Sequence, residues 1–213
     1  MIDALARTLQ LNTDEWVHLF ALAHPDPARR MMSSAPETAK PSAEQLLYAM
    51  GNVPTALLER FNDILAWNHA VYTLLAGHLN WETPAYEETR PNQIRMLFLD
   101  EHIRELYVDW QKEAERAVAS MRYVAAKFAN DRSLAELVGE LSMKSPKFTR
   151  LWAGHDVRLC TSGTKHLRYL VVGEMILNYE VLHMPEGNGQ RILTHTADFN
   201  SASHAALCPL CSM

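Results

Sequence analysis

The sequence predicts an α+β fold in which helices cover one face of a five-stranded antiparallel sheet. Three observations carry this prediction. Residues 157–197 alternate between apolar and polar side chains, residues 54–68 have the character of an earlier β-hairpin, and the residues between them follow helical spacing. Because successive side chains of a strand point to opposite faces, one face of such a sheet can line a core, and the helices have to cover it.

The region 157–197 is expected to form three antiparallel strands. Along the middle strand, the side chains expected on one face are those of Met175, Leu177, Tyr179, Val181 and His183. A tight return follows at residues 187–189, Gly-Asn-Gly, since glycine and asparagine tolerate the positive backbone angles of a hairpin turn. In the earlier hairpin, the turn is expected at Asn62-Asp63.

The amino-terminal half contains short helical segments. Two helices are expected within Met1–Ala23, with Thr13 capping the second one. Ser42 and Gln45 form a capping-box pattern at the start of a helix that ends before Gly51. A further helix over residues 69–79 leads into a loop over residues 80–91.

The middle of the chain, residues 93–129, is expected to be mostly one long helix. Its apolar residues recur every three or four positions over about seven turns. Ser133 with Glu136 is a second capping-box pattern, and Ser145 before Pro146 marks a third helix start. Two early strands, a helical crossover and a three-strand meander together have the layout of a PAS-like sensor domain.

Composition shifts divide the chain into four parts. Residues 24–41 hold four prolines without any periodicity, which is typical of a linker. We therefore expect a helical pair at 1–23, a linker at 24–41, a sensor domain at 42–199 and a flexible tail at 200–213.

The composition is that of a soluble globular protein. Hydrophobic residues make up 48% of the 213 residues and charged residues 21%, and no apolar run approaches the ~20 residues of a membrane span. The three cysteines and the absence of a signal-peptide pattern indicate the reducing cytoplasm. The formal net charge of −5, with scattered lysines and arginines, argues against DNA binding by these residues alone.

Five sequence segments, in this order along the chain, resemble segments of the MmyB-like transcription regulators. They are LARTLQLNTDEWVHLFALA, ERFNDILAWNHA, RMLFLDEHIRELYVDWQKEAERAVASMR, LAELVGELSMKSPKFTRLWAGHDVR and SGTKHLRYLVVGEMILNYEVLHMP. The resemblance covers roughly residues 1–196. It implies a bacterial regulator with an XRE-class helix-turn-helix and a PAS-like domain that binds a small apolar ligand such as a fatty acid. Residues 1–23 would then be the last helices of a helix-turn-helix domain whose recognition helix lies before Met1.

A ligand pocket in such a fold would lie between the sheet and its covering helices, and it would be largely apolar with a few placed polar groups. The apolar candidates are Trp67, Phe98, Trp110, Met121, Trp152, Leu177 and Tyr179. The polar candidates for a ligand headgroup are Asn68, His155, Arg158 and Lys165. For each apolar candidate, the competing interpretation is an ordinary core residue. No resident cofactor is expected, and a homodimer is a possible partner state.

Two alternative functions remain open at this point. An enzyme acting on an acyl or lipid-like substrate would use His155 with a distant partner, although no nucleophile-elbow pattern is present. A ligand-free interaction module would instead expose a large apolar patch. The segment Ser162-Gly163-Thr164-Lys165 resembles a phosphate loop only weakly, and a strand turn accounts for it better.

The carboxyl-terminal residues offer one further motif. His204, Cys208 and Cys211 have the spacing H-x3-C-x2-C, and imidazole and thiolate are zinc ligands. His195 or His183 is the candidate fourth ligand. Because a second clear knuckle is missing, a frayed, exposed tail is the expected structure and metal binding is the alternative.

Overall fold

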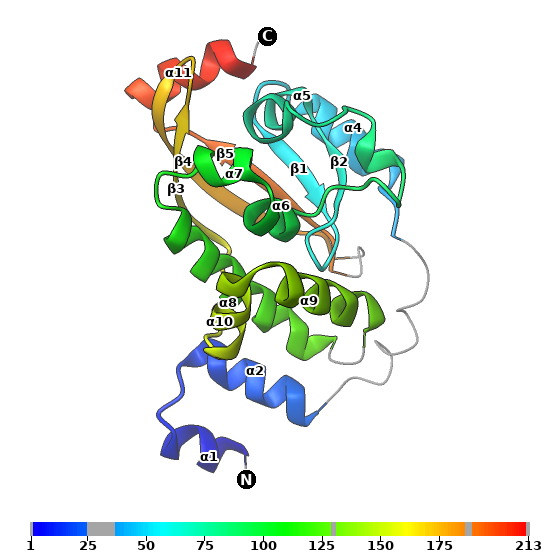
Figure 1. The fold of residues 1–213 in the computed structure, drawn as a ribbon, viewed down its shortest axis with the longest axis vertical. Coiled ribbons are helices and arrows are strands. Elements are labelled where there is room, and N and C mark those ends of the chain that lie inside the picture. Colours follow the sequence, from blue (N-terminus) through cyan, green and yellow to red (C-terminus); the bar gives the residue numbers. More distant parts are fainter. Residues whose placement is uncertain (1, 25–36, 129–130, 186–188, 212–213) are drawn as a thin grey trace. The chain divides into compact units, whose positions relative to one another are not determined.

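A computed structural model describes residues 2–24, 37–128, 131–185 and 189–211 (Figure 1). The chain divides into two compact units. The first consists of residues 1–35 and 114–160 and is helical wherever it has regular structure, whereas the second consists of residues 36–113 and 161–213 and contains the sheet. The expected linker at 24–41 falls mostly on residues 25–36, which lie outside the described residues.

The sheet has five antiparallel strands in the order β2-β1-β5-β4-β3 (Figure 1). Its strands are β1 (Thr55–Leu58), β2 (Ile64–Trp67), β3 (Ser162–Tyr169), β4 (Gly173–His183) and β5 (Arg191–Thr196). The α+β class and the division into two early and three late strands are therefore confirmed. Asn62 adopts a φ of 76° in the β1–β2 turn, as expected for a residue that tolerates the left-handed region.

Alternation along β4 separates a buried face from an exposed one. Met175, Leu177 and Tyr179 are buried, whereas Ile176 is 56% exposed and Leu182 is 49% exposed. The prediction of which β4 side chains face the core is confirmed for these residues. Residues 187 and 188 of the expected β4–β5 turn lie outside the described residues.

Helix α4 (Pro41–Ala49) covers one face of the early strands. Its Ala43 and Leu47 pack into a buried cluster that is completed by side chains of the sheet, namely Leu57, Leu65 and Ile192. Lys40 is the N-cap residue and Pro41 is the first helical residue, so the expected capping by Ser42 is wrong. Proline is favoured at this position because the first helical N–H has no partner within the helix.

Short helices carry the chain from β2 across the sheet towards β3. They are α5 (His69–Val71), the π-helix η1 (Tyr72–Ala76), the 3-10 turn η2 (Thr83–Ala85), α6 (Gln93–Leu99) and α7 (Glu101–Leu106). The prediction of one long helix over 93–129 is wrong in its first part. Asp100 accepts hydrogen bonds from the backbone N–H groups of His102 and Ile103, so it ends α6 and caps α7.

A second break separates α7 from α8 (Trp110–Lys127). There Tyr107 forms an isolated antiparallel bridge with Leu167 of β3, and the Val108 N–H donates to the carbonyl of His166. Apolar spacing alone did not reveal either break, because the apolar stripe continues through both positions.

The first unit contains α1 (Ile2–Thr8), α2 (Thr13–Ala23), α8 from Ala114 onward, α9 (Arg132–Lys144) and α10 (Pro146–Ala153). The caps of these helices only partly follow the predictions. Ser145 caps α10 as predicted, but Asn12 caps α2 in place of Thr13, and Asp131 caps α9 in place of Ser133. In both corrected cases the cap lies one or two residues earlier, where the chain is still extended.

The carboxyl-terminal segment forms a helix, α11 (Ala202–Cys211), in place of the expected frayed tail. Leu207 and Leu210 are buried, and the Ser203 hydroxyl accepts a hydrogen bond from the Ile176 N–H of β4. Burial of two leucines stabilises the helix despite Pro209 within it. The sequence pattern did not indicate this helix, because two buried leucines, Leu207 and Leu210, make a short apolar stripe and Pro209 between them is unfavourable in a helix.

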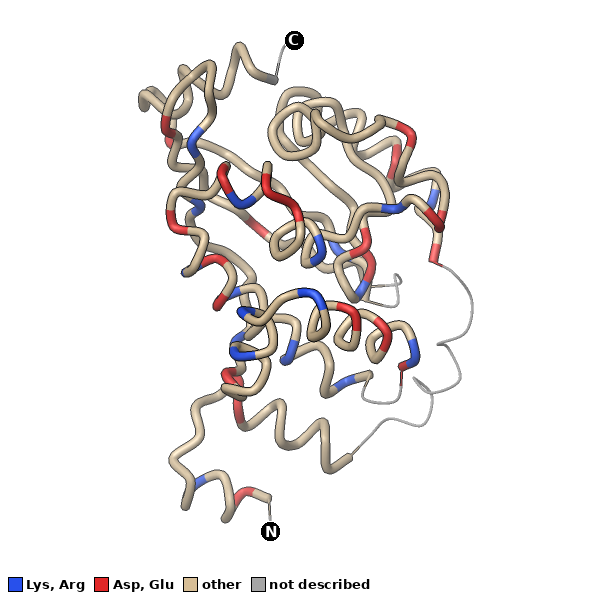
Figure 2. Tube along the Cα trace, in the orientation of Figure 1, with Lys and Arg blue, Asp and Glu red and all other residues tan. Residues whose placement is uncertain are grey.

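Charges of both signs are spread along the described elements (Figure 2), in agreement with the scattered basic residues of the sequence. Within the described part of the chain, no helix is both long and apolar enough to cross a membrane.

Glu59 is a buried carboxyl group at the end of β1, only 6% exposed. Its side chain accepts hydrogen bonds from the backbone N–H groups of Phe61 and Asp63. Burial raises the pKa of Glu59 to about 7, and the Asp63 carboxylate acts in the same direction. Between about pH 4.5 and 7 the folded state therefore binds more protons here than the unfolded state. The free energy of unfolding loses this contribution as the pH rises through that window.

We expect the substitution Glu59→Gln to remove this loss, because glutamine still accepts both hydrogen bonds and carries no charge. Relative to the wild type, the variant should gain about 3 kcal/mol in unfolding free energy at pH 8 and little at pH 4.5. Urea unfolding at the two pH values measures the difference. The exposed Glu87→Gln is the matched control, and an equal change at both pH values for Glu59→Gln would contradict the assignment.

Candidate ligand-binding site

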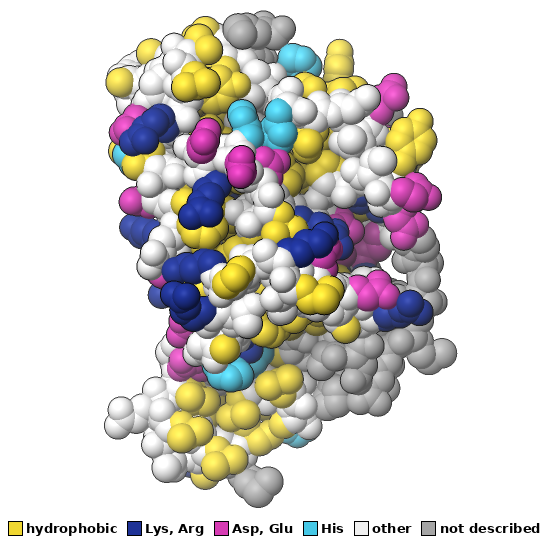
Figure 3. Space-filling view, viewed as in Figure 1, with side chains coloured by type: hydrophobic (Ala, Val, Ile, Leu, Met, Phe, Trp, Pro, Cys, Tyr) yellow, Lys and Arg dark blue, Asp and Glu magenta, His cyan; other side chains and the backbone are white. Residues whose placement is uncertain are grey.

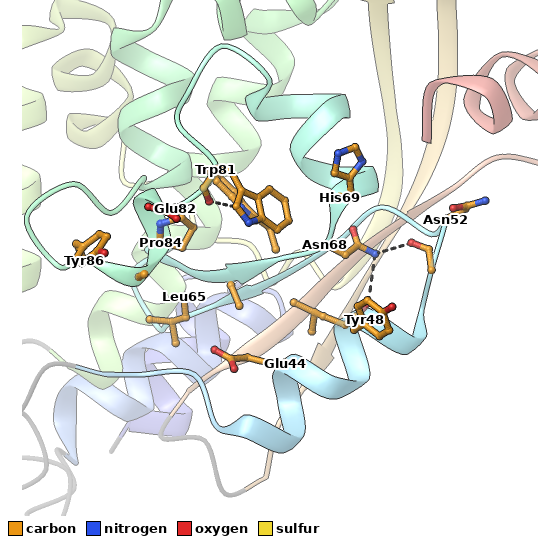
Figure 4. Close-up of a pocket in the computed structure, with 15 residues that line it drawn as sticks. Glu44, Tyr48, Asn52, Leu65, Asn68, His69, Trp81, Glu82, Pro84 and Tyr86 are labelled. Carbon is orange, nitrogen blue, oxygen red and sulfur yellow. Dashed lines mark hydrogen bonds between the residues drawn. The ribbon is translucent and has the colours of Figure 1, made fainter. Parts of the chain in front are cut away.

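A pocket of about 820 Å³ opens beside β2 in the second unit, between α4 and residues 81–86 (Figure 4). In Figure 4, Glu44 and Tyr48 extend from α4, Trp81, Glu82, Pro84 and Tyr86 lie on the other side, and Leu65 lies between them. The remaining lining residues are Leu47, Gly51, Asn52, Ala66, Trp67, Asn68, His69 and Ala85. The lining is thus aliphatic and aromatic with a few polar groups, which is the usual composition of a small-molecule site.

An aromatic cluster forms the wall above β2. The indole N–H of Trp67 donates to the carbonyl of Trp81 at 3.1 Å, and the two ring centroids are 6.1 Å apart. Tyr72 meets the Trp81 ring edge-on at 5.1 Å. Trp67 is 7% exposed, whereas Trp81 is 43% exposed. Trp81 is therefore held in place by its neighbours while much of its surface stays open to a ligand.

Asn68 lines the pocket, but its carboxamide is already fully engaged. The side-chain oxygen accepts hydrogen bonds from the N–H groups of Thr55 and Val71, and the amide group donates to the carbonyls of Gly51 and Val53. These bonds cap α5 and hold the segment between α4 and β1. The Asn68 side chain therefore has a structural role, and its role as a contact for a ligand headgroup stays a prediction.

A second polar group of residues lies on the inner sheet face, around Lys165 of β3. Its ammonium group forms an ion pair with Glu113 at 2.8 Å, donates to the Tyr107 hydroxyl at 3.3 Å and lies 5.3 Å from the Tyr179 ring centroid. Burial alone would lower the pKa of Lys165, but the charge of Glu113 and the bond to Tyr107 outweigh it, so the pKa is raised. Lys165 is thus a permanent cation with an internal counter-ion.

His195 of β5 is fully buried beside this group. It lies opposite Tyr179 in the sheet register, and Tyr179 in turn lies opposite Gly163, so the three form one row across β5, β4 and β3. Neither ring nitrogen of His195 has a hydrogen-bond partner among the described residues. Burial, assisted by the charge of Lys165, lowers the pKa of His195 to about 3, so the imidazole is neutral at physiological pH.

The Tyr179 ring lies directly over Gly163. A Cβ atom on Gly163 would come within 3.0 Å of a carbon of that ring, and the residue has a φ of +155°. The segment Ser162–Lys165 is part of β3, so its interpretation as strand structure rather than a phosphate loop is confirmed.

Phe98 and Trp110 lie together at the junction of α6, α7 and α8. Their rings meet edge-on at 5.8 Å, the Trp110 indole donates to the carbonyl of Leu97 at 2.7 Å, and the Arg104 guanidinium covers the Trp110 ring. Both side chains are half-buried and neither lines the described pocket beside β2.

Four of the eleven predicted residues belong to the first unit. Met121 is buried in it, and Trp152 stacks on Phe148. The Arg122 guanidinium lies 4.2 Å from the Trp152 ring centroid and also contacts the His155 ring nitrogen at 3.2 Å. Arg158 is exposed, and its backbone N–H donates to the carbonyl of Ala119. A cation beside His155 is not the carboxylate that usually orients a catalytic histidine.

The seven residues of the second unit fall into separate groups. Trp67 and Asn68 line the pocket, Lys165, Leu177 and Tyr179 share β3 and β4, and the other two lie at the α6–α8 junction. A ligand role for all eleven residues stays a prediction. Sequence reasoning missed Tyr48, Trp81 and Tyr86 as pocket residues. The one available signal was two aromatic residues, Trp81 and Tyr86, in the aperiodic loop 80–91, where no helical or strand spacing accounts for them.

Among the described residues, no group of three or more histidine, cysteine, aspartate or glutamate side chains is arranged to hold a metal ion. His204 and Cys208 approach each other to 3.9 Å on α11, and the side chain of Cys211 lies outside the described part.

Comparisons with known proteins bear on most of the chain, including residues 114–160 of the first unit. A search of curated proteins gives no match. The family model described as the MmyB-like transcription regulator ligand binding domain matches residues 39–210, which includes both early strands, the three-strand meander and α11. This match covers most of the chain. The chain therefore belongs to the family of MmyB-like transcription regulator ligand-binding domains.

Proposed function

We propose that this chain is the effector-sensing part of a transcription regulator, and that residues 42–199 are a PAS-like domain holding a small apolar ligand, such as a fatty acid. The observation that carries the proposal is a family match that spans the sheet together with a pocket beside β2. The strand order β2-β1-β5-β4-β3, with two early strands and a late meander, supports the PAS-like assignment.

The pocket beside β2 is the proposed binding site. An alkyl chain would lie against Leu65, Trp67 and Trp81, and its polar end would reach the open side of the pocket. Burying such a chain stabilises the complex by roughly 0.8 kcal/mol per CH₂ group. A ligand of eight to ten carbons therefore has enough apolar surface for stable binding, once the cost of immobilising it is subtracted.

The helical pair α1–α2 is proposed as the remainder of a helix-turn-helix domain through which the ligand state reaches DNA. Figure 3 shows hydrophobic side chains gathered over the amino-terminal helices. Leu5, Leu9, Phe20 and Leu22 of these helices are each 44–63% exposed. Apolar residues exposed in such a group indicate a surface that another part of the protein covers. For the ligand to control DNA binding, it has to bind one conformation more tightly than the other.

Denaturing mass spectrometry of an organic extract tests the ligand proposal. We expect an apolar compound at about one equivalent per chain in the extract of the purified protein, and none in the extract of an unrelated protein from the same host. An empty extract, together with no thermal shift across a lipid panel, would contradict the proposal.

The substitution Trp81→Ala should reduce retention of that compound. Removing the ring deletes a large, partly exposed apolar wall of the pocket, so we expect roughly a tenfold weaker affinity. The measurement is the amount of compound that remains per mole of protein after extended dialysis. Phe199→Ala is the matched control, because Phe199 is 82% exposed and does not line the pocket. Equal retention in both variants would place the ligand elsewhere.

A further inference from the structure

The side chain of Arg90 bridges two parts of the second unit that are far apart in the sequence. Its Nε donates to the carbonyl of Pro84 at 3.1 Å, and its Nη1 donates to the carbonyl of Glu37 at 3.1 Å. Pro84 is a buried residue that lines the pocket beside β2, on the side opposite α4 (Figure 4). Because a guanidinium group presents its donors in a rigid planar fork, it restrains the two carbonyls relative to each other. The pocket wall at Pro84 and the position of Glu37 are therefore linked through Arg90.

Glu37 is held by its side chain as well as by its carbonyl. One oxygen of its carboxylate forms an ion pair with Arg60, and the other accepts a hydrogen bond from the side-chain amide of Gln190 at 3.2 Å. The same amide donates to the carbonyl of Thr38 at 3.3 Å. The side chains of the ion pair are only 12% exposed at Glu37 and 6% exposed at Arg60. Releasing Glu37 would break an ion pair at a site that water barely reaches, which is costly and makes the held position a distinct state.

Glu37 lies where the chain enters the second unit. Residues 1–35 belong to the first unit, and the second unit begins at residue 36. Residues 25–36 lie outside the described residues, so Glu37 is the first described residue after this connection. From Glu37 the chain continues into α4, which contributes three residues to the lining of the pocket. A change in the hold on Glu37 would therefore act at a connection between the two units.

We propose that Arg90 couples the ligand pocket to this connection: a ligand bound beside β2 strengthens the hold on Glu37, and the empty pocket releases Glu37 more often. This inference rests on the proposed function, because it names the route by which a bound ligand changes the chain outside its pocket. The ligand binds the conformation in which residues 81–86 form the pocket wall, and in that conformation the carbonyl of Pro84 is in place for Arg90. By thermodynamic linkage, holding Glu37 favours ligand binding by the same factor.

Cleavage by a glutamate-specific protease reports on Glu37 directly, because the protease has to bind the carboxylate that Arg60 and Gln190 engage in the held state. The probe ligand is decanoate, added to the full chain after removal of any bound compound, and mass spectrometry follows the fragment that ends at Glu37. We expect saturating decanoate to slow this cleavage about fivefold, at the lower end of typical coupling between two sites. An unfolded peptide substrate of the same protease controls for a direct effect of decanoate on the protease.

Substitutions of Arg90 test whether it carries the coupling. In Arg90→Met, which removes both hydrogen bonds, cleavage after Glu37 should be faster than in the wild type and should no longer respond to decanoate. Calorimetry should give a Kd for decanoate about fivefold higher than that of the wild type. Arg90→Lys keeps the charge but replaces the fork by a single ammonium group, so it should also lose most of the response, and it preserves the test if Arg90→Met fails to fold.

The matched control is Arg168→Met. Arg168 pairs with Glu174 across β3 and β4, and neither residue lines the pocket beside β2. This variant loses an arginine and an ion pair without touching the proposed route. It should therefore bind decanoate and respond to it as the wild type does.

The remaining outcomes separate this inference from the proposed function. If decanoate binds the wild type but leaves cleavage after Glu37 unchanged, the coupling is overturned and the sensor proposal stays intact. If both Arg90 variants are cleaved faster but decanoate still slows the cleavage fivefold, Arg90 has a merely structural role, and the coupling through it is again overturned. If decanoate does not bind and the organic extract is empty, both proposals fail.

Discussion

The pocket region depends on the carboxamide of Asn68. This one side chain bonds to backbone groups at the end of α4, at the start of β1 and in the first turn of α5. It is 7% exposed, so these bonds form away from water and losing them would leave several backbone groups unsatisfied. Because Glu44 and Tyr48 belong to α4 and Trp67 precedes Asn68, this side chain fixes α4 relative to the end of β2. The opposite side of the cavity is held by the hydrogen bond from the Trp67 indole to the carbonyl of Trp81.

The inner sheet face contrasts with this open pocket. Lys165, Glu113 and Tyr107 satisfy one another there, whereas His195 is fully buried without a side-chain partner among the described residues. Burial and the charge of Lys165 both lower the pKa of His195, so the imidazole is neutral and adds no second positive charge beside Lys165. On the inner face Lys165 thus has an internal counter-ion, whereas the acidic residues that line the pocket beside β2, Glu44 and Glu82, are exposed to solvent.

Much of the sheet could be predicted from the sequence, because strand alternation is a local pattern. The buried set Met175, Leu177 and Tyr179 follows directly from it, and the turn at Asn62 follows from the tolerance of asparagine for a positive φ. The breaks at Asp100 and Tyr107 were hidden, since a cap and a β-bridge interrupt a helix without disturbing its apolar spacing. The pocket beside β2 was harder to predict from the sequence than these helix breaks. It combines α4 with a loop some forty residues later, and no local pattern indicates such a meeting.

The two edges of the sheet share a feature that limits how this protein can assemble. On β2, the Ile64 N–H donates to the carbonyl of Pro91 and Asp63 pairs with Asn92, and on β3 the segment 107–108 pairs with residues 166–167. Short irregular segments thus occupy backbone groups that another strand would need. A homodimer that extended the sheet along the whole of either edge would have to displace them. The hairpin tip with the exposed Leu170 and Val171 offers a side-chain surface for self-association instead.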